Sequence, residues 1–364
     1  MNPSLARPWR PSGYQMIKTF KIRNFRGFKS AGLENCRRMN VVVGDNGSGK
    51  TAFLEALFMV GGPSPEVALR IRNWRGFEGN VTGTAASIEE ALWRDLFFDF
   101  DRKRGISISI EGAEPHTRTL GISYTPPSDL KIPLSEAAAP IAVSAPITFE
   151  WRGPYGRHVR ITPTIIGGAL QMPPVQDVPT ETFFFGSNIP HSALESASRF
   201  SILSKASRED EFVKVMRRIF PDLLDISIEI AGGTALLFAK TAAFAEKVPL
   251  PLLSTGLNKL ASIYTAIASQ RRSIVLVDEL ENGFYFRRLP GIWKALRELC
   301  KENDVQLFAT THSAECLEAA GALAEEAPED FSVIHVGRKD GESHLRQFDG
   351  TRFAEALDEN IEIR

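Results

Sequence analysis

Cysteine is scarce in this chain of 364 residues. The three cysteines that occur, Cys36, Cys300 and Cys316, form no CxxC pair and have no histidine at the spacing of a zinc site. This usage favours a reducing compartment and excludes a metal knuckle built on cysteine. We therefore expect the three thiols to be buried or incidental.

Long apolar runs are also missing. No stretch approaches the roughly 20 apolar residues that cross a bilayer, and the apolar segment 137–145 is interrupted by Pro140. The N-terminus contains Arg7 and Arg10 but also three prolines, and no apolar core follows, which excludes a secretory signal. The sequence predicts a cytoplasmic protein with no membrane partner.

A strong net charge is the third missing feature. The formal charge is −1 and the isoelectric point is near 6.6, so no basic field covers the whole surface. DNA is then a possible partner only through a local patch. The arginines that could form one are Arg70, Arg72 and Arg75, then Arg271 and Arg272, then Arg287 and Arg288. The alternative is that they are ordinary solvated surface.

The first part of the chain reads as a strand, a glycine-rich loop and a helix. Residues 17–25 alternate apolar and basic side chains, which is typical of an antiparallel strand with one solvated face. Residues 39–43 are a mostly apolar strand, a glycine-rich loop follows, and residues 51–60 have helical spacing. Because the first strand pattern directly follows Met16, residues 1–15 are expected to be a separate arm.

The middle of the chain changes character at residue 103. Short strand-like runs separated by prolines and glycines predict a β-rich lobe over residues 103–190. Helical patterns follow over residues 192–203 and 209–219. Two further strand patterns, 226–230 and 235–239, flank a pair of glycines and predict a hairpin.

The final third alternates regularly between helix and strand. The expected helices are 256–269, 290–300 and 314–324, and the expected strands are 274–277, 305–309 and 331–336. Such alternation is typical of βαβ units and predicts a parallel sheet.

A phosphate-binding loop is indicated by the string GDNGSGKT at residues 44–51. It follows a buried-type strand and opens a helix, which is the context that this motif needs. Lys50 is expected to bridge the β- and γ-phosphates, and the Thr51 hydroxyl to hold Mg²⁺. The alternative is a glycine-rich turn that merely caps a helix. The ATP-binding residues expected here are Gly44, Asp45, Asn46, Gly47, Ser48, Gly49, Lys50 and Thr51.

Two strands end in polar residues where ligand sites of open α/β sheets lie. SIVLVDE ends in Asp278, expected to support Mg²⁺, and Glu279, expected to orient or deprotonate the attacking water. The alternative is a pair of solvated acids. LFATTHS brings His312 to the next strand end, where we expect it to touch the γ-phosphate and to act in catalysis with Glu279 and Lys50. A structural histidine in a turn is the alternative.

The segment LSTGLNKL, residues 253–260, is a polar turn that opens an amphipathic helix. Helix N-termini bind anions, so Ser254 and Gly256 could hold a γ-phosphate. Nothing in this geometry requires the ATP to belong to the same subunit. Ser254 could equally be a plain N-cap.

The order of these motifs resembles that of the ABC-type ATPase heads of the RecF and SMC group. It is more closely similar to stand-alone AAA-domain ATPases related to OLD-family proteins. The segments that carry the resemblance are KIRNFRGF, GDNGSGKT, LSTG, VDELENG and TTHS, which span residues 17 to about 320.

The resemblance implies an α/β fold. We expect an ABC-type P-loop ATPase head with a mixed N-terminal sheet, a parallel core sheet and an inserted β-rich and helical lobe. The expected division is an arm at 1–15, the first part of the head at 16–102, the β-rich lobe at 103–190, a helical subregion at 191–222 and the second part of the head at 223–364.

The resemblance also implies a homodimer, or a higher even-numbered assembly, that sandwiches ATP. Lys50 and Thr51 of one subunit would face Ser254 and Gly256 of another, and residues 281–283 would meet the partner. The chain departs from the pattern in two places, with LSTGLNK for LSGGQ and Leu280 for the usual proline. It has no clear Q-loop glutamine, although the aromatic run 183–186 could close that region.

An effector domain is not indicated by the sequence. OLD-type nucleases carry a Toprim domain with a DxD cluster, and the only DxD here, 99–101, reads as a solvated loop. The resemblance therefore implies an ATPase subunit that controls a separate nuclease or toxin, as in bacterial anti-phage systems. The alternatives are a RecF-like DNA-binding ATPase and, less in keeping with the motifs, a single-chain nuclease.

Overall fold

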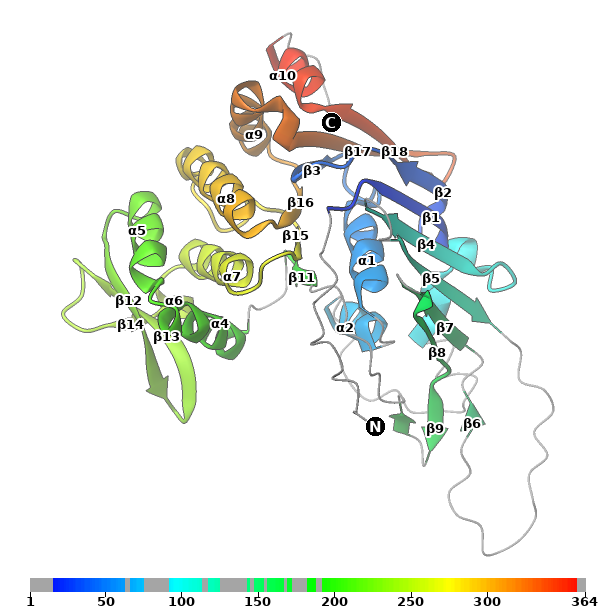
Figure 1. Cartoon of the computed structure of the whole chain (residues 1–364), viewed down its shortest axis with the longest axis horizontal. Coiled ribbons are helices and arrows are strands. Elements are labelled where there is room, and N and C mark those ends of the chain that lie inside the picture. The colour runs from blue at the N-terminus through cyan, green and yellow to red at the C-terminus, as the bar shows by residue number, and fades with distance from the viewer. Residues whose placement is uncertain are drawn as a thin grey trace, which may run out of the picture.

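The structure is a computed structural model. It describes residues 16–62, 66–74, 92–112, 117–124, 143–144, 147–153, 156–166, 169–171, 182–187 and 192–358. The arm expected at 1–15 and Arg75 lie outside these residues. Two six-stranded sheets and two three-stranded sheets are formed within the described part of the chain (Figure 1).

The first sheet is antiparallel throughout. In the order β2-β1-β4-β5-β7-β8, its strands are Phe28–Leu33, Thr19–Phe25, Ile106–Glu111, Thr117–Tyr124, Ile147–Arg152 and His158–Ile161. Phe20 and Ile22 of β1 are buried while Lys21 and Arg23 are exposed, which confirms the antiparallel strand with one solvated face.

Four of the strands in the predicted β-rich stretch, β4, β5, β7 and β8, extend this first sheet, whereas residues 143–144, 164–166 and 169–171 form a separate three-stranded sheet. β4 pairs with β1, and the register sets Phe20 opposite Ile110 and Ile22 opposite Ile108. These cross-strand apolar pairs bury both strands on one face and hold β4 against β1. The run 182–185, near the end of the predicted β-rich stretch, forms β11, an edge strand of the second sheet.

The second sheet is the parallel core that the alternating pattern predicts. In the order β11-β15-β16-β3-β17-β18, its strands are Thr182–Phe185, Ile274–Val277, Gln306–Thr310, Met39–Val43, Phe331–Lys339 and Glu342–Asp349. The pairs from β11 to β17 are parallel, and β18 returns antiparallel to β17. β15, β16 and β3 are buried at every residue, as strands covered on both faces are.

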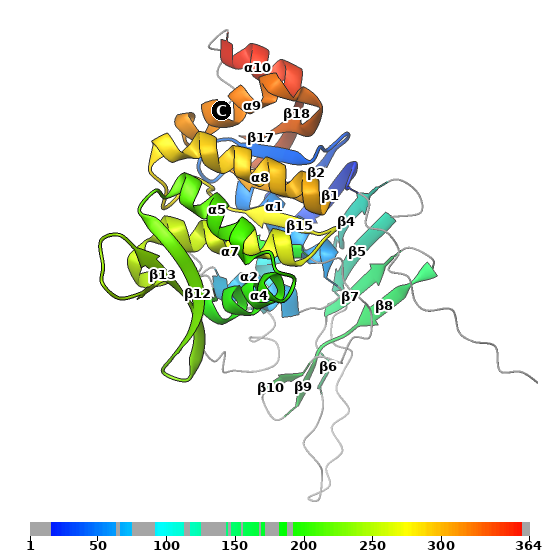
Figure 2. The same cartoon turned by 60° about the vertical axis from the view of Figure 1, so that its left-hand side comes forward.

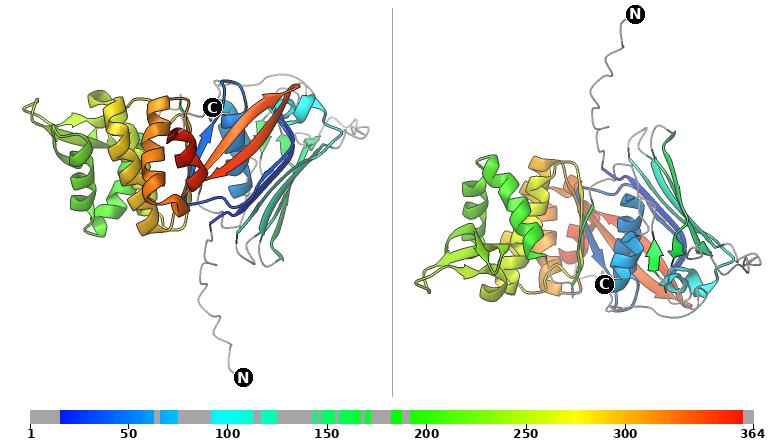
Figure 3. Two further views of the ribbon diagram at one scale, coloured as in Figure 1. Left: turned by 90° about the horizontal axis from the view of Figure 1, so that it is seen from above. Right: turned by 90° about the horizontal axis from the view of Figure 1, so that it is seen from below.

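Helix α1, Lys50–Gly61, lies between the two large sheets (Figure 3). Nearly all of its residues are buried, and Phe53 packs edge-on against Phe20 of the first sheet and Phe308 of the second. The other face of the second sheet carries α7, Thr255–Ser269; α8, Leu289–Asn303; and α9, Ala314–Glu326 (Figure 1).

A helical and hairpin unit packs on α7, on the far side of the second sheet from the first sheet (Figure 2). The Ser196 and Ser262 hydroxyls are 2.9 Å apart across this contact, and the Phe212 and Tyr264 rings meet edge to face. The predicted hairpin is confirmed. The unit comprises α4, Ala193–Lys205; α5, Glu209–Ile219; β12, Leu223–Ala231; β13, Thr234–Thr241; β14, Val248–Pro249; and α6, Leu250–Leu253.

Short elements complete the described chain. They are α2, Glu66–Trp74; η1, Arg94–Leu96; η2, Phe98–Phe100; β6, Val143–Ser144; β9, Thr164–Ile166; β10, Ala169–Gln171; η4, Phe286–Arg288; η5, Pro328–Asp330; and α10, Gly350–Asp358. None of the helices in the described ranges combines the length and apolar character needed to cross a bilayer.

Candidate nucleotide site

The glycines of the phosphate-binding loop have the conformations that the motif requires. Gly44, Gly47 and Gly49 all have positive φ, at 140°, 76° and 118°. A Cβ atom on Gly44 would lie 2.1 Å from the Val336 carbonyl oxygen, so a side chain there would force the loop away from β17. The loop runs directly into the N-terminus of α1, whose first amides are available to an anion. Its backbone therefore fits a phosphate group.

Lys50 is folded against its own loop. Its ammonium donates to the carbonyl oxygens of Gly44 at 2.6 Å and Asp45 at 3.1 Å, and the side chain is only 8% exposed. Burial lowers the pKa of Lys50 below its ordinary value, while nearby carboxylates, Asp278 foremost, act in the opposite direction. The Ser48 hydroxyl is buried in the same loop without a hydrogen-bond partner among the described atoms. Such an orphaned polar atom fits a site made for a polar ligand.

Oxygen atoms suited to Mg²⁺ converge beside the loop. The Thr51 hydroxyl donates to Asp278 Oδ2 at 2.9 Å, although 227 residues separate the two in the chain. The Thr310 hydroxyl donates to Asp278 Oδ1 at 2.6 Å. Hydroxyl and carboxylate oxygens are the ligands that Mg²⁺ takes beside ATP phosphates. The residues predicted to hold Mg²⁺ are thus brought together, with Thr310 as an addition that sequence reasoning missed.

Glu279 is held in an unusual backbone conformation. Its φ is 49°, in the left-handed region that few residues other than glycine adopt. The Glu279 amide donates to the Thr310 hydroxyl at 2.7 Å, and the Leu280 amide donates to the Thr310 carbonyl at 2.9 Å. The side-chain amide of Asn282 donates to Glu279 Oε2. The carboxylate is therefore anchored at its backbone and at one oxygen.

His312 lies close to two acidic side chains. Its Nδ1 is 3.1 Å from Glu281 Oε1 and 4.0 Å from Glu279 Oε1. Glu281 Oε1 also accepts from the backbone amides of His312 and Ser313, at 2.9 and 3.2 Å. The Glu281 side chain thus contacts the His312 turn of its own subunit, and the expected contact of residues 281–283 with a partner stays a prediction. The TTHS motif signals this turn, whereas nothing local pairs it with Glu281.

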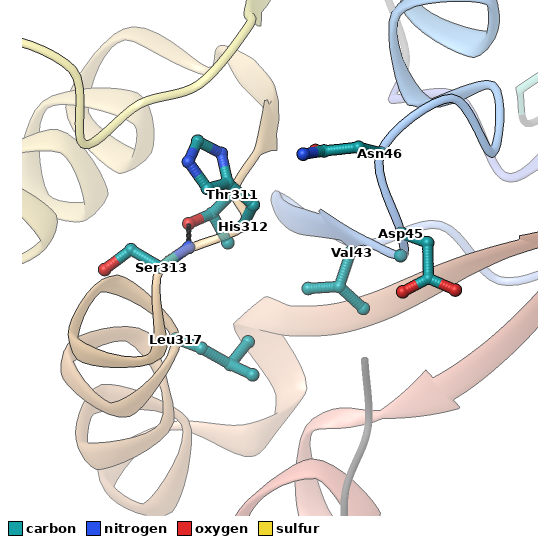
Figure 4. Close-up of a pocket in the computed structure, with 8 residues that line it drawn as sticks. Val43, Asp45, Asn46, Thr311, His312, Ser313 and Leu317 are labelled. Carbon is teal, nitrogen blue, oxygen red and sulfur yellow. Dashed lines mark hydrogen bonds between the residues drawn. The ribbon is translucent and has the colours of Figure 1, made fainter.

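A pocket of about 210 Å³ opens between the phosphate loop and the His312 turn. The side chains of Asn46 and His312 stand on opposite sides of it (Figure 4). Its lining residues are Val43, Gly44, Asp45, Asn46, Thr311, His312, Ser313 and Leu317. Lys50, Thr51 and Asp278 are not among them, so the pocket adjoins the polar cluster rather than containing it.

The predicted signature residues are placed on the N-terminus of α7. The Ser254 hydroxyl accepts from the Leu257 amide at 3.2 Å, as an N-cap does. Gly256 is pressed against the loop that follows Glu279, since a Cβ atom on it would lie 2.3 Å from the Gly283 carbonyl oxygen. These residues thus contact their own 279–284 loop. Whether they also hold the γ-phosphate of a partner remains a prediction.

The remaining expectations concern side chains away from the loop. Asp99 is exposed, and Asp101 accepts from the Lys103 amide, as in a solvated turn. No cluster of three or more candidate metal ligands occurs among the residues with a described position. The three cysteines are fully buried, and burial raises the pKa of Cys36 and Cys300 to about 12 and that of Cys316 to about 11. The aromatic run of β11 adjoins the site, since the Phe185 carbonyl accepts from the Asp278 amide at 2.7 Å.

Two family models match the chain on either side of the first sheet's later strands. The model described as "AAA ATPase domain" matches residues 16–99. The model described as "AAA domain, putative AbiEii toxin, Type IV TA system" matches residues 187–318. The two matches include the phosphate loop, the Asp278 and Glu279 pair and the His312 turn.

One curated relative is similar over most of the chain and another over a short segment. An "ATP/GTP phosphatase" of Helicobacter pylori (strain ATCC 700392 / 26695) is 23% identical over 351 residues, which are 87% of this chain and 90% of that protein. The DNA replication and repair protein RecF of Idiomarina loihiensis is 42% identical over 45 residues, only 12% of this chain and 13% of RecF.

A solved structure is similar over nearly the whole fold. The SMC head bound to the C-terminal winged-helix domain of ScpA has a TM-score of 0.52 and 14% identity, covering 94% of this chain and 99% of that chain. At this identity the likeness concerns the fold alone. The chain therefore has the mixed α/β fold of an SMC ATPase head. Two ATPase-domain models match parts of it, and a protein described as an ATP/GTP phosphatase is similar over most of its length.

Proposed function

We propose that this chain is a Mg²⁺-dependent ATPase of the OLD-like group that acts as a switch subunit. Two copies close around ATP, hydrolysis reopens them, and a separate nuclease or toxin responds to the closed state. The observation that carries the ATPase part is the meeting of Thr51, Asp278 and Thr310 beside the phosphate loop. Oxygens from three distant segments converge where a β,γ-phosphate and its metal belong.

The chemistry follows from the position of each side chain. The loop amides and Lys50 bind the phosphates, and Lys50 exchanges the carbonyls of Gly44 and Asp45 for phosphate oxygens. Thr51 and Asp278 would hold Mg²⁺, which would neutralise charge on the phosphate oxygens. Glu279 takes a proton from the attacking water as the water oxygen bonds to the γ-phosphorus. The bond from that phosphorus to the bridging oxygen then breaks, releasing ADP and phosphate.

His312 and Asn282 orient this reaction. Asn282 holds Oε2 of Glu279, and Oε1, which lies 4.0 Å from His312 Nδ1, faces the water. His312 is half-exposed at the mouth of the pocket, where its imidazole can reach a γ-phosphate. Glu281 fixes the His312 turn through two backbone amides. These contacts favour a catalytic role for His312 over a purely structural one.

The dimer is supported by what lies on the surface next to the site. The helix N-terminus at Ser254 and Gly256 adjoins an exposed segment that begins at Gly283. Tyr285 and Phe286 follow, and these large side chains are 54% and 49% exposed. Exposed aromatic residues beside an anion-binding helix end suit a surface that closes on a second copy with ATP between them.

The role in defence rests on the family resemblance and on one comparison. The description of the AAA model that matches residues 187–318 includes the words "putative AbiEii toxin, Type IV TA system". ATPase heads transmit their nucleotide state through domain closure, so a separate effector is the natural reader of that state. Bacterial anti-phage defence is the setting in which we place such a pair.

The test combines turnover with partner capture. Glu279→Gln protein, purified from its native host with ATP, should retain a nuclease or toxin that Lys50→Ala protein does not retain. Wild-type protein should hydrolyse ATP only with Mg²⁺. Absence of turnover in wild-type protein would exclude the ATPase, whereas turnover with recombination proteins in place of an effector would exclude the switch role.

A RecF-like DNA-binding ATPase is the second candidate. The short RecF match and the exposed side chains of Arg271, Arg272 and Arg287 favour it. Binding to phosphates weakens steeply as salt rises, because counterions are released on binding. ATP-dependent binding of duplex DNA that falls about 1000-fold or more between 50 and 200 mM salt would support this candidate. Equal affinity for duplex DNA with and without ATP would argue against it.

A further inference from the structure

A buried lysine joins α7 to the loop that carries Glu279. Lys259 is only 3% exposed, and its ammonium donates to the carbonyl oxygens of Glu279 at 2.7 Å, Leu280 at 3.3 Å and Asn282 at 3.4 Å. The ring of Phe284 lies 5.8 Å from the same nitrogen. One cation thus gathers the carbonyls of a loop whose first residue, Glu279, has a left-handed backbone.

The cation is costly to bury at this position. A buried ammonium loses its hydration, and only hydrogen bonds such as those to the three carbonyl oxygens offset that loss. Burial accordingly lowers the pKa of Lys259 to about 8, although Glu281, Asp278, Glu279 and Cys316 favour the charged form. A hydrophobic residue at position 259 could cover this loop. It could not hold the loop in place, because it has no donor for the three carbonyl oxygens.

A second contact makes the connection rigid. Gly256 lies one helical turn before Lys259, on the same side of α7. A Cβ atom at Gly256 would collide with the Gly283 carbonyl oxygen, so backbone meets backbone there. Helix α7 therefore contacts the 279–284 loop at both ends of one turn. A displacement of the helix N-terminus must displace the loop, and with it the carboxylate of Glu279.

We propose that Lys259 is a positioning residue that couples the N-terminus of α7 to the carboxylate of Glu279 in the same subunit. The inference rests on the proposed function, in which Ser254 and Gly256 receive the γ-phosphate of the partner's ATP. Binding of that phosphate then sets the geometry of Glu279 in the subunit that receives it. ATP bound at one site of the dimer is therefore required for hydrolysis at the other. The turnover rate then depends cooperatively on ATP concentration.

The test compares Lys259→Met and Lys259→Arg with Lys294→Met, which removes an exposed lysine from α8. Affinity for a fluorescent ATP analogue, kcat, the Hill coefficient for ATP and the thermal midpoint are measured for each. We expect Lys259→Met to bind ATP as wild type does, to lose about tenfold or more in kcat, and to show a Hill coefficient near one. Lys259→Arg should recover part of both losses, because a guanidinium can also donate to several carbonyls.

Two results would overturn the inference. One is a Lys259→Met protein with wild-type kcat and cooperativity. The other is a loss of kcat matched by an equal loss of ATP affinity, with Lys259→Arg no better. If Lys259→Met does not fold, Lys259→Gln serves in its place, since its shorter neutral side chain cannot gather the three carbonyls. Failure of the proposed function itself would appear differently, as wild-type protein without turnover.

Discussion

The Thr310 hydroxyl lies between the two acidic residues of the site. It donates to Asp278 and accepts from the backbone amide of Glu279, so a single oxygen orients both residues. Asp278 and Thr51 could be predicted because each belongs to a local pattern at a strand end or loop. Thr310, Glu281 and Lys259 could not, since their partners are set by tertiary packing.

Replacing Thr310 with valine tests this arrangement at constant volume. Thr310→Val leaves Asp278 Oδ1 and the Glu279 amide without their partner, which costs about 1–3 kcal/mol of unfolding free energy. We expect kcat to fall about 10- to 100-fold because the water-activating carboxylate is misplaced, while ATP still binds. Steady-state kinetics and equilibrium binding check this, and unchanged kcat would contradict it.

Lys50 and Glu279 should fail in different ways when substituted. Lys50→Ala removes the cation that the loop presents to phosphate, so ATP binding or hydrolysis is lost. Glu279→Gln keeps the shape of the site and removes the base, so ATP binds but scarcely turns over. Calorimetric binding combined with phosphate release distinguishes the two. Normal turnover in either variant would contradict these assignments.

The β17–β18 hairpin packs against the phosphate loop through Ser343. The Ser343 hydroxyl donates to the Ser48 carbonyl at 2.6 Å, and the Ser343 amide donates to the Gly27 carbonyl at 2.8 Å. Ser343 also fills the space beside Gly49, where a Cβ atom would lie 2.9 Å from its oxygen. The C-terminal hairpin therefore connects the loop to the turn between β1 and β2.

Enlarging Ser343 should disturb the loop without touching any phosphate-binding side chain. Ser343→Val overfills the space beside Gly49, a change that typically costs about 1–3 kcal/mol, so we expect ATP affinity to fall about tenfold. His344→Val is the matched control, because this neighbour on β18 is exposed. Equal ATP affinity in both variants would show that the hairpin does not support the loop.

The elements themselves were predictable to different degrees. The core strands could be read from the sequence because burial on both faces leaves continuous apolar runs, as in residues 274–277. The sequence did not predict β18, because most of its residues are polar and only partly buried. The sequence did not predict that β4 pairs with β1. About 80 residues separate the two strands, and a local pattern does not specify the partner of a strand.

At the scale of the whole molecule, two cores share the second sheet. One core joins that sheet to α7, α8 and α9, and the other joins it to α1 and the first sheet. The three cysteines are buried in these cores, Cys36 in one and Cys300 and Cys316 in the other. Their reactivity therefore reports on the integrity of both.

The thiols should be unreactive in the native protein. Burial raises their pKa values to about 11 to 12, so at pH 8 almost no thiolate is present and a reagent has no access. We expect no labelling by a thiol-specific disulfide reagent in buffer and three thiols labelled per chain in denaturant. Rapid labelling of any one thiol in buffer would show that its core is open.

Closure of two copies around ATP is measured most directly by the mass of Glu279→Gln protein in solution. Light scattering after size-exclusion chromatography gives that mass with Mg²⁺ and ATP, and again with Mg²⁺ and ADP. We predict one chain of 40.2 kDa with ADP and a mass of two chains with ATP. A single-chain mass while ATP is bound would contradict the ATP-gated switch. So would a two-chain mass with both ATP and ADP.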